Sequence, residues 1–336
     1  MKKNKKLDNI KSVIGKAYDI HPLYISKFKL IFSKFTTTDN HFLLKTRKET
    51  FFVKRYDISN EAKIKQEMRN ISKVKDIVNV PRIIKTKNGG SYLITRENIF
   101  VVQEYIDGKN FKEIKASLPF FFSTICDIEE KFVKSKITKH KFYSFNSRIK
   151  KFKIKSRKLL KILTKDSSLS AIENKKYLQF VIKEVDDMVP KILSLKIRQR
   201  FIHGDLLMQN IIIEPGSNLW IVDWEKSREY ITSIDILKSV MFTLFNPTKK
   251  NFNLNVEKMA TWSSYCLRHI SIEKEELTNI FNIYYFHFIT GIDFLERIYI
   301  KKENLNKKML QEDFLISKWL KGHKTNLQIK LNEAMR

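Results

Sequence analysis

The segment from 201 to 225 constrains this chain more than any other part of its 336 residues. Asp205 follows a short hydrophobic run, Asn210 comes five residues later, and Asp223 ends a second hydrophobic run. Pro215-Gly216-Ser217-Asn218 has the composition of a tight turn, so the runs on either side of it are predicted to pair as a hairpin. That hairpin would bring Asn210 and Asp223 to the same end of two neighbouring strands.

The residue types in this segment suit the transfer of a phosphoryl group from ATP. A carboxylate such as Asp205 can accept a hydrogen bond from a substrate hydroxyl while that hydroxyl attacks. The amide oxygen of Asn210 and the carboxylate of Asp223 are hard ligands of the kind that Mg²⁺ prefers. The sequence therefore predicts Asp205 as the catalytic residue, with Asn210 and Asp223 as the magnesium ligands. The alternative is a surface hairpin with ordinary turn residues.

Composition indicates a folded protein with reduced thiols. Hydrophobic residues make up 43% of the chain, and it has only 8 Gly and 6 Pro, which argues against a disordered or collagen-like chain. Cys126 and Cys266 match no metal-ligand spacing and are predicted to be buried thiols in a reducing compartment. The formal net charge of +29 favours an anionic partner such as a nucleotide or a phosphorylated sugar, although AT-rich coding explains it equally well.

No membrane span is expected. The most apolar stretch, from 280 to 295, contains Asn, His and Asp residues and is predicted to be one buried helix. The basic start of the chain is not followed by the hydrophobic segment of a signal peptide.

The first hundred residues alternate between strand-like runs and helical patterns. A short helix with a basic tail is expected over 1–22, and apolar residues at helical spacing predict a helix over 60–74. The turn Asn88-Gly89-Gly90 predicts a hairpin between 83–87 and 91–96. Runs rich in aromatic and β-branched residues predict further antiparallel strands at 23–32, 41–46, 50–56 and 99–105.

Beyond residue 110 the chain changes to long helical patterns. Residues 112–200 are basic, and between 131 and 165 there is neither Asp nor Glu. We favour a solvated helical face for 131–165, with a cationic wall that binds an anionic or polymeric acceptor as the alternative. No nucleic-acid motif accompanies it, so nucleic acid is not an expected partner. A small antiparallel sheet lobe followed by a larger helical lobe predicts an α+β, bilobal fold.

The motif His203-Gly204-Asp205, with Asn210 and the later Val222-Asp223-Trp224-Glu225, resembles the aminoglycoside phosphotransferase and choline kinase superfamily, which has a protein kinase-like fold. Within it, the chain is most similar to the spore-coat kinase-like proteins of spore-forming bacteria, over roughly residues 25 to 300. The resemblance implies an N-lobe over 1–103 with a helix, a five-stranded sheet and a second helix. It implies a hinge at 104–108 and a C-lobe over 109–336.

The resemblance also implies roles for residues in the N-lobe. Lys54 would contact the α- and β-phosphates of ATP, and Glu67 would hold Lys54 by an ion pair, with Glu61 as the alternative partner. The backbone carbonyl of Glu104 and the N–H of Ile106 would bind adenine.

Two residues near the catalytic loop are expected to be structural, and two positions depart from the family pattern. His203 would hold the loop by hydrogen bonds to the backbone, with a role as general base as the alternative, and Asp235 would brace the loop from below. The turn at 35–40 has no glycine, which is the residue that lets backbone N–H groups approach a phosphate closely. Glu225 stands where protein kinases have glycine, which fits the small-molecule branch of the fold.

The sequence thus predicts an ATP- and Mg²⁺-dependent phosphotransferase that acts on a hydroxyl of a small molecule or sugar, anionic acceptors included. Two alternatives stay open. One is a catalytically silent, kinase-fold scaffold of the spore coat, and the other is an anionic-polymer binding protein that acts through 131–165. The expected location is the cytoplasm, with the spore coat as the alternative.

Overall fold

The computed structural model describes residues 2–28, 40–135, 137, 141–245, 254–303 and 308–336. The chain divides into two compact units. The first comprises Met1–Ser117 and Leu207–Ser227, and the second comprises Leu118–Leu206 and Arg228–Arg336. The segment that carries Asn210 and Asp223 therefore belongs to the first unit. The lobe boundaries expected at 103 and 109 stay a prediction.

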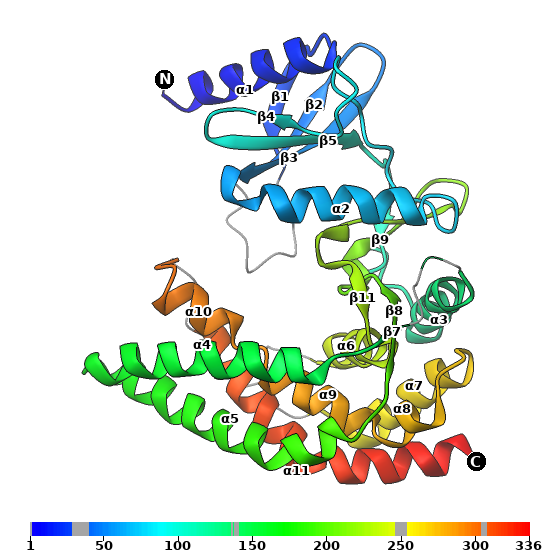
Figure 1. Ribbon diagram of the computed structural model, residues 1–336. Coiled ribbons are helices and arrows are strands. Elements are labelled where there is room, and N and C mark those ends of the chain that lie inside the picture. Colours follow the sequence, from blue (N-terminus) through cyan, green and yellow to red (C-terminus); the bar gives the residue numbers. More distant parts are fainter. Residues whose placement is uncertain (1, 29–39, 136, 138–140, 246–253, 304–307) are drawn as a thin grey trace. The chain divides into compact units, whose positions relative to one another are not determined.

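The first unit is built on a five-stranded antiparallel sheet in the order β1-β2-β3-β5-β4 (Figure 1). Helix α1 (Lys2–Tyr18) and helix α2 (Glu61–Val74) lie on opposite sides of this sheet (Figure 1). The strands are β1 (Tyr24–Lys27), β2 (His41–Lys45), β3 (Thr50–Asp57), β4 (Leu93–Ile94) and β5 (Asn98–Glu104).

Strand β3 explains why the two faces of the sheet differ. Side chains alternate along a strand, so Phe51 and Val53 point to the face opposite to that of Lys54. Phe51 and Val53 join a buried core with residues of α1, among them Ile10 and Ile14. Apolar burial on the α1 face fixes the register of β3 and so directs Lys54 to the α2 face.

Several predictions for this unit are corrected. Residues 83–87 and 91–96 do not form a hairpin with each other. Instead Ile83 forms a bridge with Gln103 of β5, and β4 pairs with β5 across the turn at 95–97. The first strand ends at Lys27, and the predicted positions 29–32 lie outside the described residues. The basic residues at the chain start are part of α1 and not a tail before it.

The predicted hairpin in the second half of the chain is confirmed. Strands β9 (Ile211–Ile213) and β10 (Leu219–Ile221) pair antiparallel, and β6 (Lys109–Asn110) completes a small sheet in the order β10-β9-β6. Gly216 and Ser217 in the turn have positive φ values of 101° and 70°. Gly108 precedes β6, and a Cβ there would lie against the backbone of Ile213, so only glycine fits.

The second unit is mainly helical. Its short sheet has the order β11-β8-β7, with β7 (Lys141–Phe142), β8 (Arg198–Ile202) and β11 (Arg228–Tyr230). Its longer helices are α3 (Leu118–Lys134), α4 (Phe145–Lys165), α5 (Leu169–Leu193), α6 (Thr232–Leu244), α7 (Val256–Arg268), α9 (Ile280–Ile289) and α11 (Lys308–Met335), and its short ones are α8 (Lys274–Thr278) and α10 (Asp293–Tyr299). The predicted α+β class is confirmed, with an antiparallel five-stranded sheet in the first unit and mainly helices in the second.

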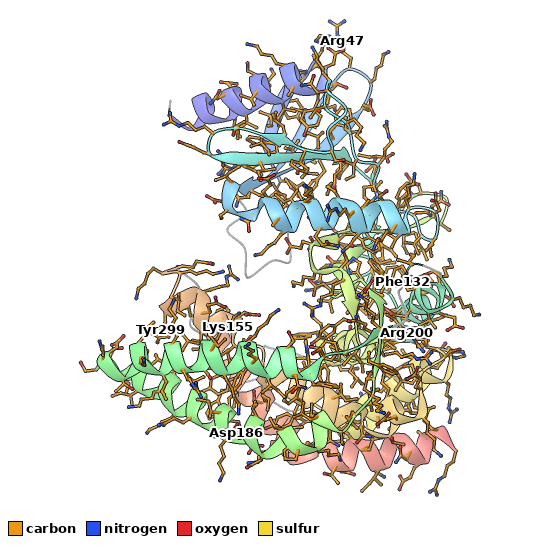
Figure 2. The ribbon with its side chains drawn as sticks, in the orientation of Figure 1. Arg47, Phe132, Lys155, Asp186, Arg200 and Tyr299 are labelled. Atoms are coloured by element: carbon orange, nitrogen blue, oxygen red, sulfur yellow. The ribbon has the colours of Figure 1, made fainter. Side chains whose placement is uncertain are left out.

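Helix α4 carries most of the described basic residues of 131–165. Its aromatic and aliphatic stripe, which includes Phe145 and Phe152, is buried. Its lysines are mostly exposed, and some form surface ion pairs, such as Lys155 with Asp293 at 2.6 Å (Lys155 is labelled in Figure 2). This arrangement favours the solvated-face interpretation for most of the helix.

The apolar stretch at 280–295 is not one helix. Helix α9 ends at Ile289, and α10 starts at Asp293 after a break that contains Gly291. Within the described ranges, no helix combines the length and hydrophobicity that crossing a membrane requires.

Glycine at 108 is predicted to be essential for the fold of the first unit. Gly108→Ala forces a methyl group against the Ile213 carbonyl and the Ile212 side chain, so we expect the free energy of unfolding to fall by about 1–3 kcal/mol. Gly322→Ala in α11 is the matched control, because nothing lies within 4 Å of its added methyl group. The control is expected to be neutral or stabilising by up to about 1 kcal/mol. Urea unfolding measures both, and equal effects would contradict the argument.

Candidate active site

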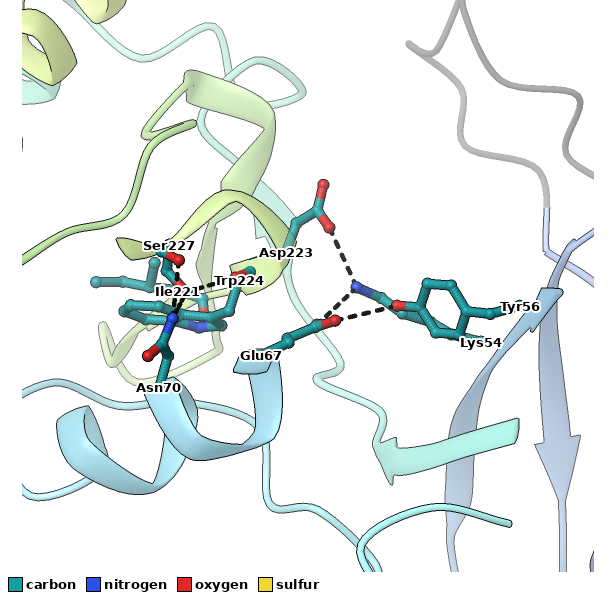
Figure 3. A network of polar contacts seen from close by, with 8 residues as sticks. All are labelled: Lys54, Tyr56, Glu67, Asn70, Ile221, Asp223, Trp224 and Ser227. Atoms are coloured by element: carbon teal, nitrogen blue, oxygen red, sulfur yellow. Dashed lines mark hydrogen bonds and ion pairs between the residues drawn. The ribbon is translucent and has the colours of Figure 1, made fainter. Parts of the chain in front are cut away.

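A buried ion-pair network in the first unit is centred on Lys54. Its Nζ lies 3.1 Å from Oδ1 of Asp223 and 3.5 Å from Oε1 of Glu67 (Figure 3). Tyr56, on the same face of β3, donates its hydroxyl to Oε2 of Glu67 at 3.3 Å. The helix α2 thus supplies one carboxylate to Lys54, and the segment after β10 supplies the other. Glu61 lies exposed at the start of α2.

The segment that carries Asp223 is fixed to α2 by a second set of bonds. Asn70 of α2 donates to the backbone oxygen of Ser227 at 2.8 Å and to its hydroxyl at 3.0 Å (Figure 3). Trp224, which follows Asp223, is buried, and its indole N–H donates to the carbonyl of Ile221. Asp223 itself adopts the left-handed backbone conformation, φ 67°, which Asp tolerates better than most residues. These bonds hold its carboxylate at Lys54.

Electrostatics keep Lys54 charged. Burial alone opposes its charge, but the surrounding acidic groups, Glu67 and Asp223 among them, raise the pKa of Lys54 well above its ordinary value. His41 of β2 is the cross-strand partner of Lys54. Burial first, and then the charge of Lys54, lower the pKa of His41 to about 4, so His41 is neutral at physiological pH.

Asn210 lies beside Asp223 because of the hairpin register. Its backbone carbonyl accepts the N–H of Val222 at 3.0 Å, and Asp223 is the next residue along the chain. Asn210 is buried at the end of a short 3-10 helix, Met208–Asn210. Both predicted magnesium ligands therefore lie at the same end of β9 and β10. Their side chains offer only oxygen donors, a set that fits a hard divalent cation.

The residues predicted to bind adenine also lie in the first unit. Glu104 ends β5, and its backbone N–H donates to the carbonyl of Arg82 at 2.9 Å. Ile106 is buried in the segment between β5 and β6. Their roles stay predictions. The glycine-free turn at 35–40 lies, apart from Asn40, outside the described residues.

Asp205 belongs to the second unit, and its meeting with Lys54 stays a prediction. Within the second unit Asp205 is held firmly. Nζ of Lys238 lies 2.6 Å from its Oδ1 and 2.7 Å from the carbonyl of Gly204. The Asp205 side chain is only 12% exposed.

The two residues predicted to be structural have that role. The Asp205 backbone N–H donates to Nδ1 of the fully buried His203 at 3.3 Å. Asp235 of α6 accepts the Gly204 N–H at 2.7 Å, so it braces the loop as predicted. Gly204 has φ 81°, which explains glycine at this position.

A second buried carboxyl group lies near Asp235. Glu129 of α3 is fully buried. Burial raises the pKa of Glu129 well above its ordinary value, and the neighbouring Asp235 raises it further. The protonated form of Glu129 is therefore favoured in the folded protein.

Sequence reasoning missed Lys238, Glu129 and His41. A signal for Lys238 was present, because it follows Asp235 by three residues and so lies on the same face of a helix. Both residues lie on α6, which starts at Thr232. No local signal pointed to Glu129 or His41, which reach their positions only through tertiary packing.

Known proteins resemble this chain in structure but not in sequence. No family model matches the sequence, and no curated protein matches it. Solved structures do match it over nearly its whole length. A choline kinase from Streptococcus pneumoniae has 17% identity and a TM-score of 0.57, with 97% of this chain and 98% of that chain covered.

Two further solved structures are phosphotransferases with bound nucleotides. A spectinomycin phosphotransferase in complex with ADP and spectinomycin has 10% identity and a TM-score of 0.59, over 97% of this chain and 98% of that chain. An amicoumacin kinase in complex with AMP-PNP, Ca²⁺ and Ami has 14% identity and a TM-score of 0.61, over 98% of this chain and 96% of that chain. The chain therefore has the fold of these small-molecule kinases, which confirms the kinase-like fold that the resemblance implied. None of these comparisons points to a spore-coat protein.

Glu129 is predicted to make stability depend on pH. Its pKa in the folded protein lies above the unfolded value of about 4.3, so the folded state binds more protons and wild-type stability falls as pH rises between these two values. Glu129→Gln cannot ionise. Its free energy of unfolding relative to wild type is therefore expected to increase as pH rises through this window.

Urea unfolding at a series of pH values measures the effect. Glu173→Gln is the control, because Glu173 lies exposed on α5, and its curve is expected to run parallel to wild type. A difference between Glu129→Gln and wild type that stays constant with pH would contradict the buried, protonated carboxyl.

Proposed function

We propose that this protein is an ATP-dependent phosphotransferase that transfers the γ-phosphate to a hydroxyl group of a small molecule or sugar. The observation that carries the proposal is Lys54, a buried ammonium held between Glu67 and Asp223. A buried charge costs free energy, and a protein keeps one where it binds or reacts. The fold shared with small-molecule kinases supports the same interpretation.

Lys54 is the group that binds the ATP phosphates in this proposal. Its pKa lies well above the ordinary value, so it is charged at every physiological pH. The Glu67 carboxylate orients the Lys54 ammonium, and the Tyr56 hydroxyl holds that carboxylate in place by a hydrogen bond. The backbone of Glu104 and Ile106 would bind adenine, as the resemblance implies.

Asn210 and Asp223 would hold Mg²⁺. Among the described residues, no group of three or more His, Cys, Asp or Glu side chains gathers as a closed metal cage. A site with two protein oxygen ligands suits Mg²⁺, which keeps waters and shares its coordination with substrate phosphates. When bound, the ion neutralises charge on the transferring phosphoryl group.

Asp205 would orient the acceptor hydroxyl and accept its proton. Lys238 holds the Asp205 carboxylate, and Asp235 holds the loop by accepting the Gly204 N–H, so little reorganisation is needed at the moment of transfer. We expect the protein in the cytoplasm, where ATP is available and where the two buried cysteines, both free thiols, stay reduced.

Loss of Asp205 is predicted to abolish transfer without abolishing nucleotide binding. Asp205→Ala should reduce kcat about 10²- to 10⁴-fold, because it removes the general base. Lys54→Ala should instead weaken ATP binding as well, since Lys54 would contact the phosphates. Turnover of labelled ATP across an acceptor panel and nucleotide binding by calorimetry measure the two effects. Circular dichroism checks that each variant folds.

Lys153→Ala is the control, because Lys153 makes a surface ion pair with Asp186 at 3.0 Å. The control should match wild type in both assays. Absence of nucleotide binding at millimolar ATP and Mg²⁺ would contradict the proposal. Nucleotide binding by wild type without turnover of any acceptor in the panel would support the alternative, a kinase-fold protein without activity.

Lys238 is predicted to set the basicity of Asp205. A cation 2.6 Å away favours the carboxylate, so removing it raises the pKa at which Asp205 loses activity. In Lys238→Met the acid limb of the pH profile of kcat should move up by about one pH unit or more. Lys238→Arg keeps the positive charge, so the acid limb of its pH profile should lie closer to that of wild type than the limb of Lys238→Met. An acid limb that does not move in Lys238→Met would show that Lys238 acts only in folding.

A further inference from the structure

Aromatic and basic side chains gather around Tyr230 in the second unit. The Tyr230 hydroxyl lies 2.7 Å from Nδ1 of His287, and it receives hydrogen bonds from Tyr143 at 3.0 Å and from Arg148 at 2.8 Å. The Arg228 guanidinium lies over the Tyr230 ring, 4.2 Å from its centre. We call Tyr143, Arg148, Arg228, Tyr230 and His287 the Tyr230 cluster.

The Tyr230 cluster lies next to the catalytic loop in the sheet. Arg228 is the cross-strand partner of Ile202, the last residue of β8. His203, Gly204 and Asp205 follow Ile202 directly. Arg228 therefore flanks the strand end from which the Asp205 loop emerges, and Lys238 contacts Asp205 itself.

Positive charge in this region is not balanced by carboxylates. In the part of the chain that the structure describes, neither Arg148 nor Arg228 forms an ion pair. Arg148 donates instead to neutral oxygens, those of Thr290, Tyr230 and His287. Glu229, between Arg228 and Tyr230 on β11, points to the other face of the strand because side chains alternate.

The buried His287 is subject to the positive charge of these side chains. Burial lowers the pKa of His287 well below its ordinary value, and the charges of Arg148, Arg228 and Lys238 lower it further. All three cations are therefore close enough to one imidazole to act on it, and His287 is neutral.

Arg228 is the member of the cluster that is available to a ligand. It is exposed, and among the described residues its guanidinium contacts the Tyr230 ring but forms no hydrogen bond or ion pair. Each of the three guanidinium nitrogens of Arg148 already donates a hydrogen bond within the protein, so Arg148 contributes mainly charge. A guanidinium fixed on an aromatic ring suits bidentate binding of a phosphate or carboxylate.

We propose that the acceptor of this enzyme carries a phosphate or carboxylate group, which binds Arg228 while the reacting hydroxyl faces Asp205. This inference rests on the proposed function. The same cations repel an acceptor that carries an ammonium group, so amines are disfavoured as substrates. Charge at the acceptor site, and not only its shape, then selects the substrate.

A matched acceptor series tests the proposal with the full-length chain. The probes are a hexose, its 6-phosphate, the corresponding hexuronic acid and the corresponding 2-amino sugar. Binding of each to the Mg²⁺–ADP complex is measured by calorimetry, and transfer is measured with labelled ATP and Mg²⁺. We expect the phosphate or the carboxylate to bind about tenfold or more tightly than the neutral sugar, and the amino sugar to bind least. The difference should shrink at high salt.

Arg228→Ala should remove the preference, and Arg228→Glu should reverse it. Arg198→Ala is the matched control, since it removes one positive charge from β8, where Arg198 pairs with Glu273. The control should keep the preference of wild type. Thermal unfolding checks that all variants fold.

The outcomes separate this inference from the proposed function. If no anionic probe binds more tightly than the neutral sugar, or if Arg228→Ala behaves like Arg198→Ala, the anionic-acceptor inference is overturned. Asp205-dependent turnover of ATP would still uphold the phosphotransferase. If wild type binds no nucleotide and turns over no ATP, the proposed function itself fails.

Discussion

The buried ion pairs of Lys54 are the interaction on which the first unit depends. One strand, one helix and the hairpin that carries Asp223 each contribute one charged side chain to this network. Removing Lys54 would leave the buried Glu67 carboxylate without this cation, which costs more than the intact pair contributes. The network therefore ties three separate elements to one arrangement. Asn70 and Ser227 repeat the link between α2 and the Asp223 segment with neutral groups.

In the second unit, one face of helix α6 organises the catalytic loop. Asp235, Lys238 and Ser239 follow at helical spacing and contact Gly204, Asp205 and Leu206 in the same order. The loop itself has little regular structure, so its conformation comes from these side chains and from His203. The first turns of α6 thus hold the loop in a conformation that needs the positive φ of Gly204.

Local chemistry was the part of this structure that the sequence predicted well. The hairpin at 215–218 is correct because its turn residues adopt positive φ and its flanking runs are hydrophobic on both sides. The hairpin predicted at 88–90 is wrong although its turn is equally typical. There Ile84 donates to Val102 of β5, so pairing with a strand distant along the chain outweighs the local turn.

The sequence by itself determined the chemistry of the candidate site. It fixed an Asp, an Asn and a second Asp around a hairpin, and a lysine on an alternating strand. It also determined the α+β class of fold, because hydrophobic period and turn composition are local properties, while the kinase-like fold was implied by the resemblance of the motifs. Tertiary structure alone decided which charges surround these residues. Glu129, His41 and the Tyr230 cluster come from distant parts of the chain. The pKa shifts of Glu129, His41, Tyr230 and His287 arise from burial and proximity, which no local pattern encodes.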